Sequence, residues 1–210
     1  MTRLLKSRYL KKRERYCVVI SALNAVGRRQ EAILLLQNAI KNHRIPASFF
    51  TELYIHLSLF LGYPTMLEGL EHLTRYPQKT VRKHGGSGGS GRTVFQRVYG
   101  DQTNSVLKAL ESFHPELASW ILRDAYGRVF TRSGMTLRER ELSNVATLGV
   151  GGFAPQFFSH VRGAVRVGVN PKAIKETLDY ISEFAKIDKN LSTKILGQVK
   201  KSARRATRTR

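Results

Sequence analysis

Apolar side chains recur at helical intervals over most of the chain. From Tyr16 to Ile40 they return every three or four residues, and Gly27 interrupts the pattern, which predicts two consecutive helices. Pro46 suits the first turn of the next helix, which should end where residues 62–64 read Gly-Tyr-Pro. A further short helix is expected over 66–73. The strict alternation typical of a strand is not sustained anywhere in the sequence.

The second half of the chain carries the same helical signals. Helices are predicted over about 102–113 and 116–130. Thr136 stands just before the next periodic run with Glu139 three residues later, which is the pattern of a capping box. Two more helices are expected after Pro155 and from Pro171 onward. The sequence therefore predicts an all-α protein built from paired helices.

Two stretches of the chain, 125 residues apart, read as copies of one unit. The segment 12–16 lies over 137–141 at this offset. Two ionisable residues of the second copy are replaced in the first, where Tyr16 stands for Glu141 and Leu35 for His160. Residues that agree between the copies include Gly27 and Gly152, Ala39 and Ala164, Pro46 and Pro171, and Leu53 and Leu178. The chain is therefore expected to hold at most one active centre.

A glycine- and serine-rich run over 85–91 marks the boundary between the two copies, as a natural joint or as an engineered linker. The predicted organisation has five parts. They are a basic N-terminal arm (1–11), a degenerate first repeat (12–80), a basic Gly/Ser-rich linker (81–97), a second repeat (98–190) and a basic tail (191–210).

The net charge of +21 is concentrated in three segments. Residues 1–15 carry +6, residues 72–100 carry +6 and residues 194–210 carry +7, which leaves about +2 for the rest of the chain. Flexible Lys and Arg arms bind polyanions because each neutralised phosphate releases counterions. A basic tail that only aids solubility or serves as an address is the alternative. Three extensions that hold nearly all the charge favour polyanion binding.

Several classes of chemistry are excluded by composition. Cys17 is the only cysteine, so disulfide frameworks, zinc knuckles and CxxC redox chemistry are ruled out, and neither a metal nor a cofactor is expected. No apolar run approaches 18 residues, so no membrane partner is expected. The first 13 residues hold Arg and Lys but no acid, which fits a transit segment or a retained basic arm. A mitochondrial location is the first expectation and a cytoplasmic one the alternative.

Several spaced motifs follow one another between residues 98 and 184. They are Tyr126-Gly127, the run Phe130-Thr131-Arg132-Ser133-Gly134-Met135-Thr136-Leu137-Arg138-Glu139-Arg140-Glu141, then His160-Val161-Arg162-Gly163-Ala164, and Gly168-Val169-Asn170-Pro171. In this order they resemble the carboxymuconolactone decarboxylase family, whose all-helical fold is shared by the AhpD-like alkylhydroperoxidases. The resemblance implies tandem AhpD-like repeats that pack as a pseudo-dimer, or a homo-oligomer.

The resemblance also implies a candidate site. In the AhpD-like branch a Glu, a CxxC pair and a His form a proton relay, and Glu141 and His160 have that spacing. Phe153 and Gln156 stand where the cysteines would be, so thiol peroxidase activity is excluded. In the decarboxylase branch His160 would serve as general acid/base, with Arg162 near a substrate carboxylate.

The sequence also allows His160 and Glu141 to have a purely structural role. His160 is equally explained as a buried, hydrogen-bonded histidine, sealed beneath Phe157 and Phe158. Glu141 is equally explained as a surface carboxylate that pairs with Arg138 or Arg140. The histidines that fit no ligand pattern are interpreted as structural or solvated, and they include His56, His72 and His114.

Two functions follow from these observations. The first is a non-catalytic RNA-binding adaptor of a ribonucleoprotein particle, with a mitochondrial ribosome or its assembly machinery as the expected setting and other particle proteins as partners. The second is a decarboxylase-type enzyme acting on a small carboxylated lactone through Glu141, His160 and Arg162. The residues expected to contact RNA phosphates are Arg3, Lys6, Arg8, Lys11, Lys12, Arg82, Lys83, Lys200, Lys201, Arg204, Arg205, Arg208 and Arg210.

Overall fold

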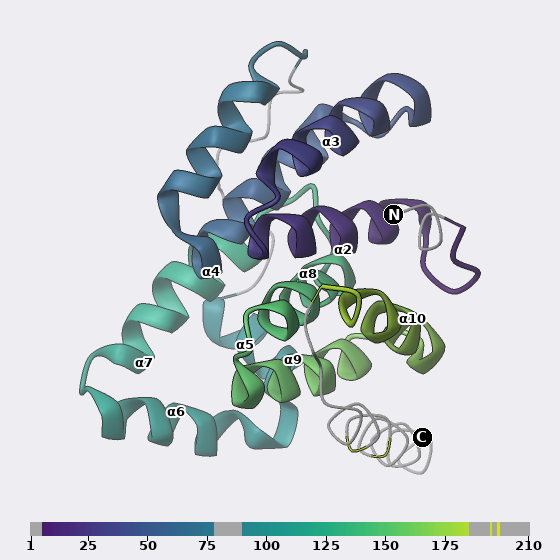
Figure 1. The fold of residues 1–210 in the computed structure, drawn as a ribbon. Coiled ribbons are helices and arrows are strands. Elements are labelled where there is room, and N and C mark those ends of the chain that lie inside the picture. The colour runs from purple at the N-terminus through teal and green to yellow at the C-terminus, as the bar shows by residue number, and fades with distance from the viewer. Residues whose placement is uncertain (1–5, 78–89, 185–193, 195–196, 198–210) are drawn as a thin grey trace.

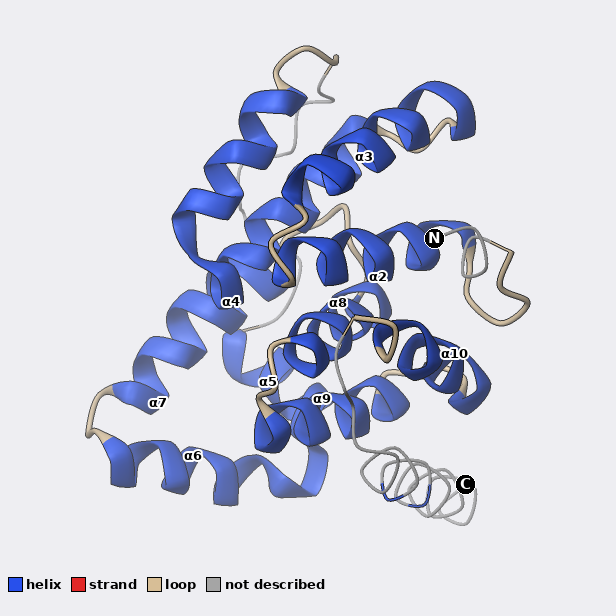
Figure 2. Ribbon diagram, viewed as in Figure 1, coloured by secondary structure: helices blue, strands red, loops and turns tan. Residues whose placement is uncertain are grey.

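A computed structural model describes residues 6–77, 90–184, 194 and 197 of the 210-residue chain (Figure 1). Every regular element within these residues is helical (Figure 2), which confirms the all-α prediction. In chain order they are α2 (Lys12–Ala25), α3 (Arg29–His43), α4 (Ala47–Leu73), α5 (Gly91–Tyr99), the 3₁₀ turn η1 (Gly100–Gln102), α6 (Thr103–Phe113), α7 (Leu117–Trp120), the π-helix η2 (Ile121–Phe130), α8 (Leu137–Val150), α9 (Ala154–Arg166) and α10 (Pro171–Ile181).

The first turn of α8 is closed by the predicted capping box. The backbone N–H of Glu139 donates to the Thr136 hydroxyl over 3.3 Å, and the Thr136 N–H donates to the Glu139 carboxylate over 2.7 Å. Helix α2 begins in a related way, because the Lys11 N–H donates to the Glu14 carboxylate over 2.8 Å. Both helices therefore start at residues that satisfy otherwise unpaired backbone donors.

Helix α4 changes direction where the sequence predicts an end. Gly62 has φ 75° and ψ 175°, outside helical geometry, and Pro64 follows two residues later. A side chain at this φ would be strained, so glycine permits the turn. The predicted stop is therefore a sharp kink, after which the helix resumes and runs to Leu73.

Helix α5 corrects the predicted linker. The linker was expected to reach residue 97, but α5 begins at Gly91, where Ser90 caps it by accepting from the Thr93 N–H over 3.3 Å. The helix buries Phe95 fully and packs on η2. A Cβ at Gly91 would come within 2.0 Å of the Leu122 carbonyl, so glycine is required for this close approach. The remainder of the predicted linker lies largely outside the described residues.

The N-terminal arm is also shorter than predicted. Within it, Leu10 is buried with 1% exposure, and the Ser7 hydroxyl contacts the carboxylate of Glu176 on α10. The chain is thus packed on the folded body from Ser7 onward, rather than from residue 12.

Helices α2 and α8 form the most extensive helix pair of the described fold and lie across its centre (Figure 1). Their ion pairs are reciprocal. Arg13 Nε lies 2.9 Å from a Glu139 carboxylate oxygen, and Arg138 Nε lies 3.1 Å from a Glu14 carboxylate oxygen. Arg13 and Arg138 are 125 residues apart in sequence, and so are Glu14 and Glu139. This exchange of partners is the pattern expected of two units related by a two-fold axis.

The offset also matches the limits of the helices. Helices α2 and α8 begin at residues 12 and 137, and α3 and α9 at 29 and 154. Gly27 and Gly152, between the helices of each pair, have φ of 80° and 76°. The internal repeat remains a prediction, and these features agree with it.

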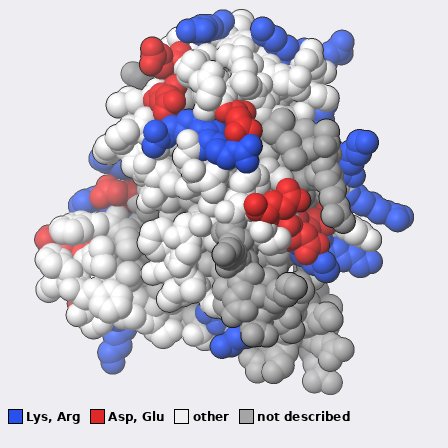
Figure 3. All heavy atoms as spheres, viewed as in Figure 1, with Lys and Arg blue, Asp and Glu red and all other residues white. Residues whose placement is uncertain are grey.

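The surface of the described residues mixes both signs of charge. On the face shown in Figure 3, Lys and Arg side chains are spread out, with Asp and Glu among them. No helix within 6–77 and 90–184 has both the length and the apolar character needed to cross a bilayer.

Candidate active site

The structure brings Glu141 and His160 into direct contact. Glu141 lies on α8 and is fully buried, and His160 lies on α9 with 6% exposure. Its Nδ1 is 3.0 Å from Glu141 Oε2. One turn along α9, a Cβ at Gly163 would come within 2.4 Å of that oxygen. The glycine therefore leaves the space in which the carboxylate reaches the imidazole.

Asn144 and Glu141 both meet His160 at Nδ1, since Asn144 Nδ2 lies 3.1 Å from that nitrogen, and the carboxylate indicates which ring nitrogen carries the hydrogen. Asn144 Nδ2 donates to Glu141 Oε1 over 3.2 Å, so both carboxylate oxygens are engaged. An ionised carboxylate can only accept, and Nδ1 of His160 therefore carries the hydrogen. Within the described part of the chain, no group bonds to Nε2 of His160. That nitrogen is left with a free lone pair, as a general base requires.

His56 extends this network from α4, in the first half of the chain. Its Nε2 is 2.7 Å from Asn144 Oδ1, and its Nδ1 is 3.3 Å from Arg140 Nη1. The Asn144 oxygen can only accept a hydrogen bond, and the Arg140 guanidinium can only donate one. Nε2 of His56 therefore donates to Asn144, and Nδ1 of His56 accepts from Arg140. Complete burial, followed by the Arg140 charge, lowers the pKa of His56 to about 3, which keeps the ring neutral.

A buried group of charges lies beyond His56. Arg132 holds both carboxylate oxygens of Glu52, at 2.7 and 2.8 Å, and Arg140 Nη2 lies 3.9 Å from the same carboxylate. Glu52 and Arg140 are fully buried. Burial lowers the pKa of Arg140 to about 10, with Glu52 opposing the shift, so the guanidinium is still charged at neutral pH. The Glu52 carboxylate therefore faces two guanidinium groups in this interior, and such buried charges are tolerated only when they are paired.

We define the relay as Arg140, His56, Asn144, Glu141 and His160, which are joined in that order. Its members come from α4, α8 and α9, so the site is completed only when both halves of the chain pack together. Sequence reasoning found Glu141 and His160 through the family resemblance. It missed the other three, and it interpreted His56 only as structural or solvated, whereas the ring is buried within the network.

A signal for the missed residues was present in the sequence. Glu52 and His56 stand four residues apart, and Glu141 and Asn144 stand three apart, so each pair shares one face of its helix. Polar residues that share a face with apolar neighbours are candidates for a buried network. Nothing in the spacing shows that the two faces meet.

Aromatic rings from other helices surround His160. Phe60 of α4 stands edge-on at 6.1 Å between ring centroids, and Tyr99 of α5 at 6.2 Å. Burial raises the pKa of Tyr126 well above its usual value, and the adjacent Tyr99 and Glu141 add to the shift. Burial also raises the pKa of Tyr99. Both phenols therefore keep their protons at neutral pH.

The expectation that Phe157 and Phe158 seal His160 is wrong in its choice of rings. Phe157 is buried in the core, where its ring would touch a Cβ placed at Gly149. The rings that contact the imidazole are Phe60 and Tyr99.

Arg162 does not join the site in the predicted way. It follows His160 by two residues on α9, and residues at this spacing point to different sides of a helix. The surface interpretation of Glu141 is also wrong. Its carboxylate is fully buried, while Arg138 pairs with Glu14 and Arg140 lies beside Glu52.

The structure describes only part of the predicted RNA-binding set. Four of these residues are exposed near the N-terminus, on the segment that leads into α2: Lys6, Arg8, Lys11 and Lys12. The others lie outside the described residues: Arg3, Arg82, Lys83, Lys200, Lys201, Arg204, Arg205, Arg208 and Arg210.

Thiol and metal chemistry find no support in the described ranges. No group of three or more His, Cys, Asp or Glu residues within them is arranged to hold a metal ion. Cys17 is buried, its thiol donates to the Glu139 carbonyl, and burial raises its pKa. Phe153, in place of a redox cysteine, is 58% exposed at the start of α9.

The neutral state of His56 predicts a loss of stability in acid. The folded pKa of about 3 lies below the unfolded value of about 6.5, so only the unfolded chain takes up this proton as the pH falls between them. This group should lower the free energy of unfolding by up to about 1.4 kcal/mol per pH unit in that window. Urea unfolding of the wild type and of His56→Gln between about pH 7 and pH 4 measures the difference in slope. Equal slopes would contradict the prediction.

The fold and this geometry define an all-α protein with a buried carboxylate–imidazole pair. No family model matches the chain. The chain is 24% identical over 182 residues to Peroxisomal protein 2 of Schizosaccharomyces pombe, covering 81% of this chain and 85% of that protein. It is 29% identical over 96 residues to 4-carboxymuconolactone decarboxylase of Acinetobacter baylyi, covering 45% of this chain and 72% of that protein. The chain is therefore distantly similar to a decarboxylase and to a peroxisomal protein, in agreement with the resemblance noted from its motifs.

Proposed function

We propose that the chain is an enzyme that uses His160 as a general acid/base on a small carboxylated substrate. The observation that carries the proposal is the pairing of His160 Nδ1 with Glu141, which leaves Nε2 unbonded. Buried histidines that serve structure alone are expected to have both nitrogens satisfied. His56, in the same network, is satisfied at both nitrogens and illustrates the difference.

The reaction class is taken from the distant relative whose name specifies decarboxylation. In such a step the bond to the carboxylate carbon breaks, CO₂ leaves, and the electron pair passes into the adjacent unsaturated system. The Nε2 lone pair of His160 first takes up a proton from water, and the imidazolium then delivers that proton to the substrate carbon, which restores the lone pair. Glu141 would stabilise the imidazolium, as a carboxylate does for a catalytic histidine elsewhere.

The other residues of the site support this role. Asn144 Nδ2 donates to the Glu141 carboxylate over 3.2 Å, and His56 Nε2 donates to Asn144 Oδ1 over 2.7 Å and so orients the amide. Tyr99, whose ring centroid lies 6.2 Å from that of His160, and the adjacent Tyr126 retain their protons because burial raises the pKa of both phenols. Arg162 is left out of the proposed chemistry because of its position on α9.

The direct test is turnover of 4-carboxymuconolactone by the full chain, followed as CO₂ release. Turnover that depends on His160 is the expected result. A chain that is folded by circular dichroism and releases no CO₂ would overturn the assignment of this substrate.

RNA binding is a second candidate, favoured by the charge distribution alone. The three basic segments hold +19 of the net +21, by the sums given above. The comparisons give this role no support, and we propose it as a separate property of the extensions. Lys6, Arg8, Lys11 and Lys12, which are exposed, would take part together with the basic residues beyond the described ranges.

Neutralising the C-terminal arm should weaken RNA binding and its dependence on salt. Seven Lys and Arg lie in residues 194–210, so replacing them with Gln should lower the slope of log K against log salt by up to about 5 for a single strand. Filter binding of a labelled RNA from about 50 to 200 mM salt measures both quantities. An unchanged slope would remove this arm from the RNA-binding surface.

A further inference from the structure

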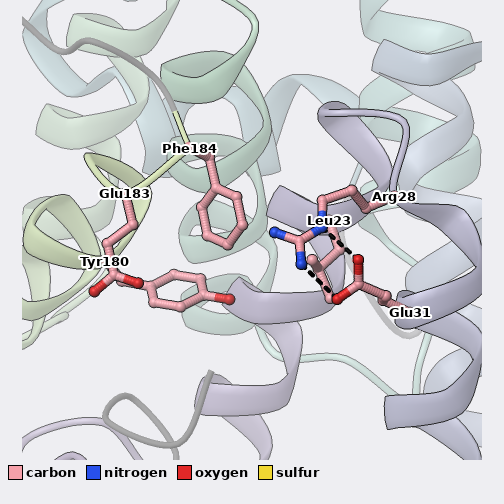
Figure 4. Close-up of a pocket in the computed structure, with 6 residues that line it drawn as sticks. All are labelled: Leu23, Arg28, Glu31, Tyr180, Glu183 and Phe184. Carbon is pink, nitrogen blue, oxygen red and sulfur yellow. Dashed lines mark hydrogen bonds and ion pairs between the residues drawn. The ribbon is translucent and has the colours of Figure 1, made fainter.

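A pocket separate from the relay lies between the ends of α2 and α10. It is lined by Leu23, Arg28, Glu31, Tyr180, Glu183 and Phe184, and its volume is about 150 Å³ (Figure 4). None of these residues belongs to the relay. Leu23 is buried to 1% exposure and gives the pocket an apolar wall, to which the Tyr180 and Phe184 rings add.

The hydroxyl of Tyr180 has no hydrogen-bond partner among the described residues. Tyr180 is 3% exposed, and its oxygen is buried. A buried hydroxyl without a protein partner costs free energy, which a ligand bound in the pocket would recover. In Figure 4 the hydroxyl points toward Arg28 and Glu31. Burial raises the pKa of Tyr180, so its proton is available for donation.

Arg28 supplies a second unused donor. Its Nε and Nη2 donate to the two oxygens of Glu31, each over 2.5 Å, and no bond is made by Nη1 within the described residues. The guanidinium carbon lies 5.5 Å from the centre of the Phe184 ring. Figure 4 shows the guanidinium facing the Phe184 ring and the hydroxyl end of Tyr180. Arg28 is about half exposed, with 49% of its side chain accessible, so a ligand can shift it without disturbing the core.

The charges around the pocket disfavour an anionic ligand. Glu31 already neutralises Arg28, and Glu183 adds one more negative charge at the rim. Arg28 Nη1 can only donate and the Tyr180 hydroxyl can also donate, so a ligand with an acceptor oxygen satisfies both groups. A cavity of about 150 Å³ is large enough for one six-membered ring.

We propose that this pocket binds a small neutral cyclic carbonyl compound, such as a cyclic ketone or lactone. The carbonyl oxygen would accept from the Tyr180 hydroxyl and from Arg28 Nη1, and the ring would pack on Leu23 and Phe184. The site is independent of His160, so its failure and the failure of the proposed enzyme are separate results.

Four probes that share one ring test the ligand class on the full chain. They are cyclohexanone, cyclohexane, cyclohexanecarboxylate and cyclohexylamine, which differ only in the group that meets the donors. Titration with NMR detection should give cyclohexanone a millimolar Kd, with shifts at Leu23, Tyr180 and Phe184. Cyclohexane and the two charged probes should each bind at least about threefold more weakly, because they lack the neutral acceptor.

Two conservative variants test the contacts. Tyr180→Phe should weaken cyclohexanone about 2- to 10-fold while keeping the thermal midpoint, because the hydroxyl has no protein partner to lose. Glu31→Gln should leave the Arg28 charge uncompensated and shift the preference toward cyclohexanecarboxylate. Tyr63→Phe is the matched control, since Tyr63 is 71% exposed and lies outside the pocket.

The outcomes are distinct. Selective binding of cyclohexanone that is weakened by Tyr180→Phe and unchanged by Tyr63→Phe supports the proposal. It is overturned by no binding, by equal affinity for cyclohexane, by stronger binding of either charged probe to the wild type, or by shifts that map elsewhere.

Discussion

His160→Gln should lower the turnover of 4-carboxymuconolactone by about 10²- to 10⁴-fold, the usual contribution of a positioned acid/base. Glutamine keeps a polar side chain of similar reach but has no group that exchanges a proton near neutral pH. His160 is 6% exposed, and its Nδ1 bond of 3.0 Å to Glu141 holds the ring in one orientation. The loss should therefore fall on kcat rather than on KM, because the proton moves only in the transition state.

The controls separate chemistry from structure. His114→Gln should leave turnover unchanged, since His114 is exposed and lies outside the relay. Glu141→Gln should lower kcat as well, because a neutral amide accepts the Nδ1 hydrogen without stabilising the imidazolium. Circular dichroism and thermal unfolding of each variant show that the fold is kept. A folded His160→Gln with wild-type kcat would show that His160 is not the proton donor.

Glu52→Ala should destabilise the protein by about 3–5 kcal/mol, the usual cost of removing one partner from a buried ion pair. Glu52 is fully buried between two guanidinium groups, with Arg132 at 2.7 Å and Arg140 at 3.9 Å. Arg140 is itself fully buried, so its charge would be left without a carboxylate. Urea unfolding at neutral pH measures the change in the free energy of unfolding.

The matched control is an exposed pair of the same type. Glu31 is held by two bonds from Arg28, as Glu52 is by Arg132, but about half of each side chain is accessible to solvent. Water screens such a pair, so Glu31→Ala should leave the unfolding midpoint close to that of the wild type. A small effect of Glu52→Ala, similar to that of Glu31→Ala, would show that the buried charges relax or neutralise after the substitution.

The helices were predictable because their signals are local. The break at Gly27, the capping box of Thr136 and Glu139, and the kink at Gly62 all lie where sequence reasoning placed them. Helix α5 was not predicted because the linker that follows from the glycine-rich run was extended to residue 97. The helix is only nine residues long, and packing on η2 stabilises it.

The candidate site was predictable only in part. Glu141 and His160 stand 19 residues apart in sequence, and the family resemblance supplied their pairing. His56 lies 88 residues from Asn144 and 84 from Arg140, and no local pattern links them. The family resemblance also supplied Arg162, which stands two residues after His160 on α9 and therefore points to a different side of that helix.

The sequence by itself determined the all-α class, most helix limits, the absence of a cysteine pair and the concentration of positive charge in three segments. These follow from periodicity, capping residues and composition, which act over a few residues at a time. The tertiary structure alone decided that α4 of the first half reaches the Glu141–His160 pair, so that His56 and Asn144 orient it. It also decided that Glu52 and Arg140 lie together in the interior and that Tyr180 lines a pocket. The physical reason is that burial and the low dielectric of the interior depend on which helix faces meet, and that is set by packing across the whole chain.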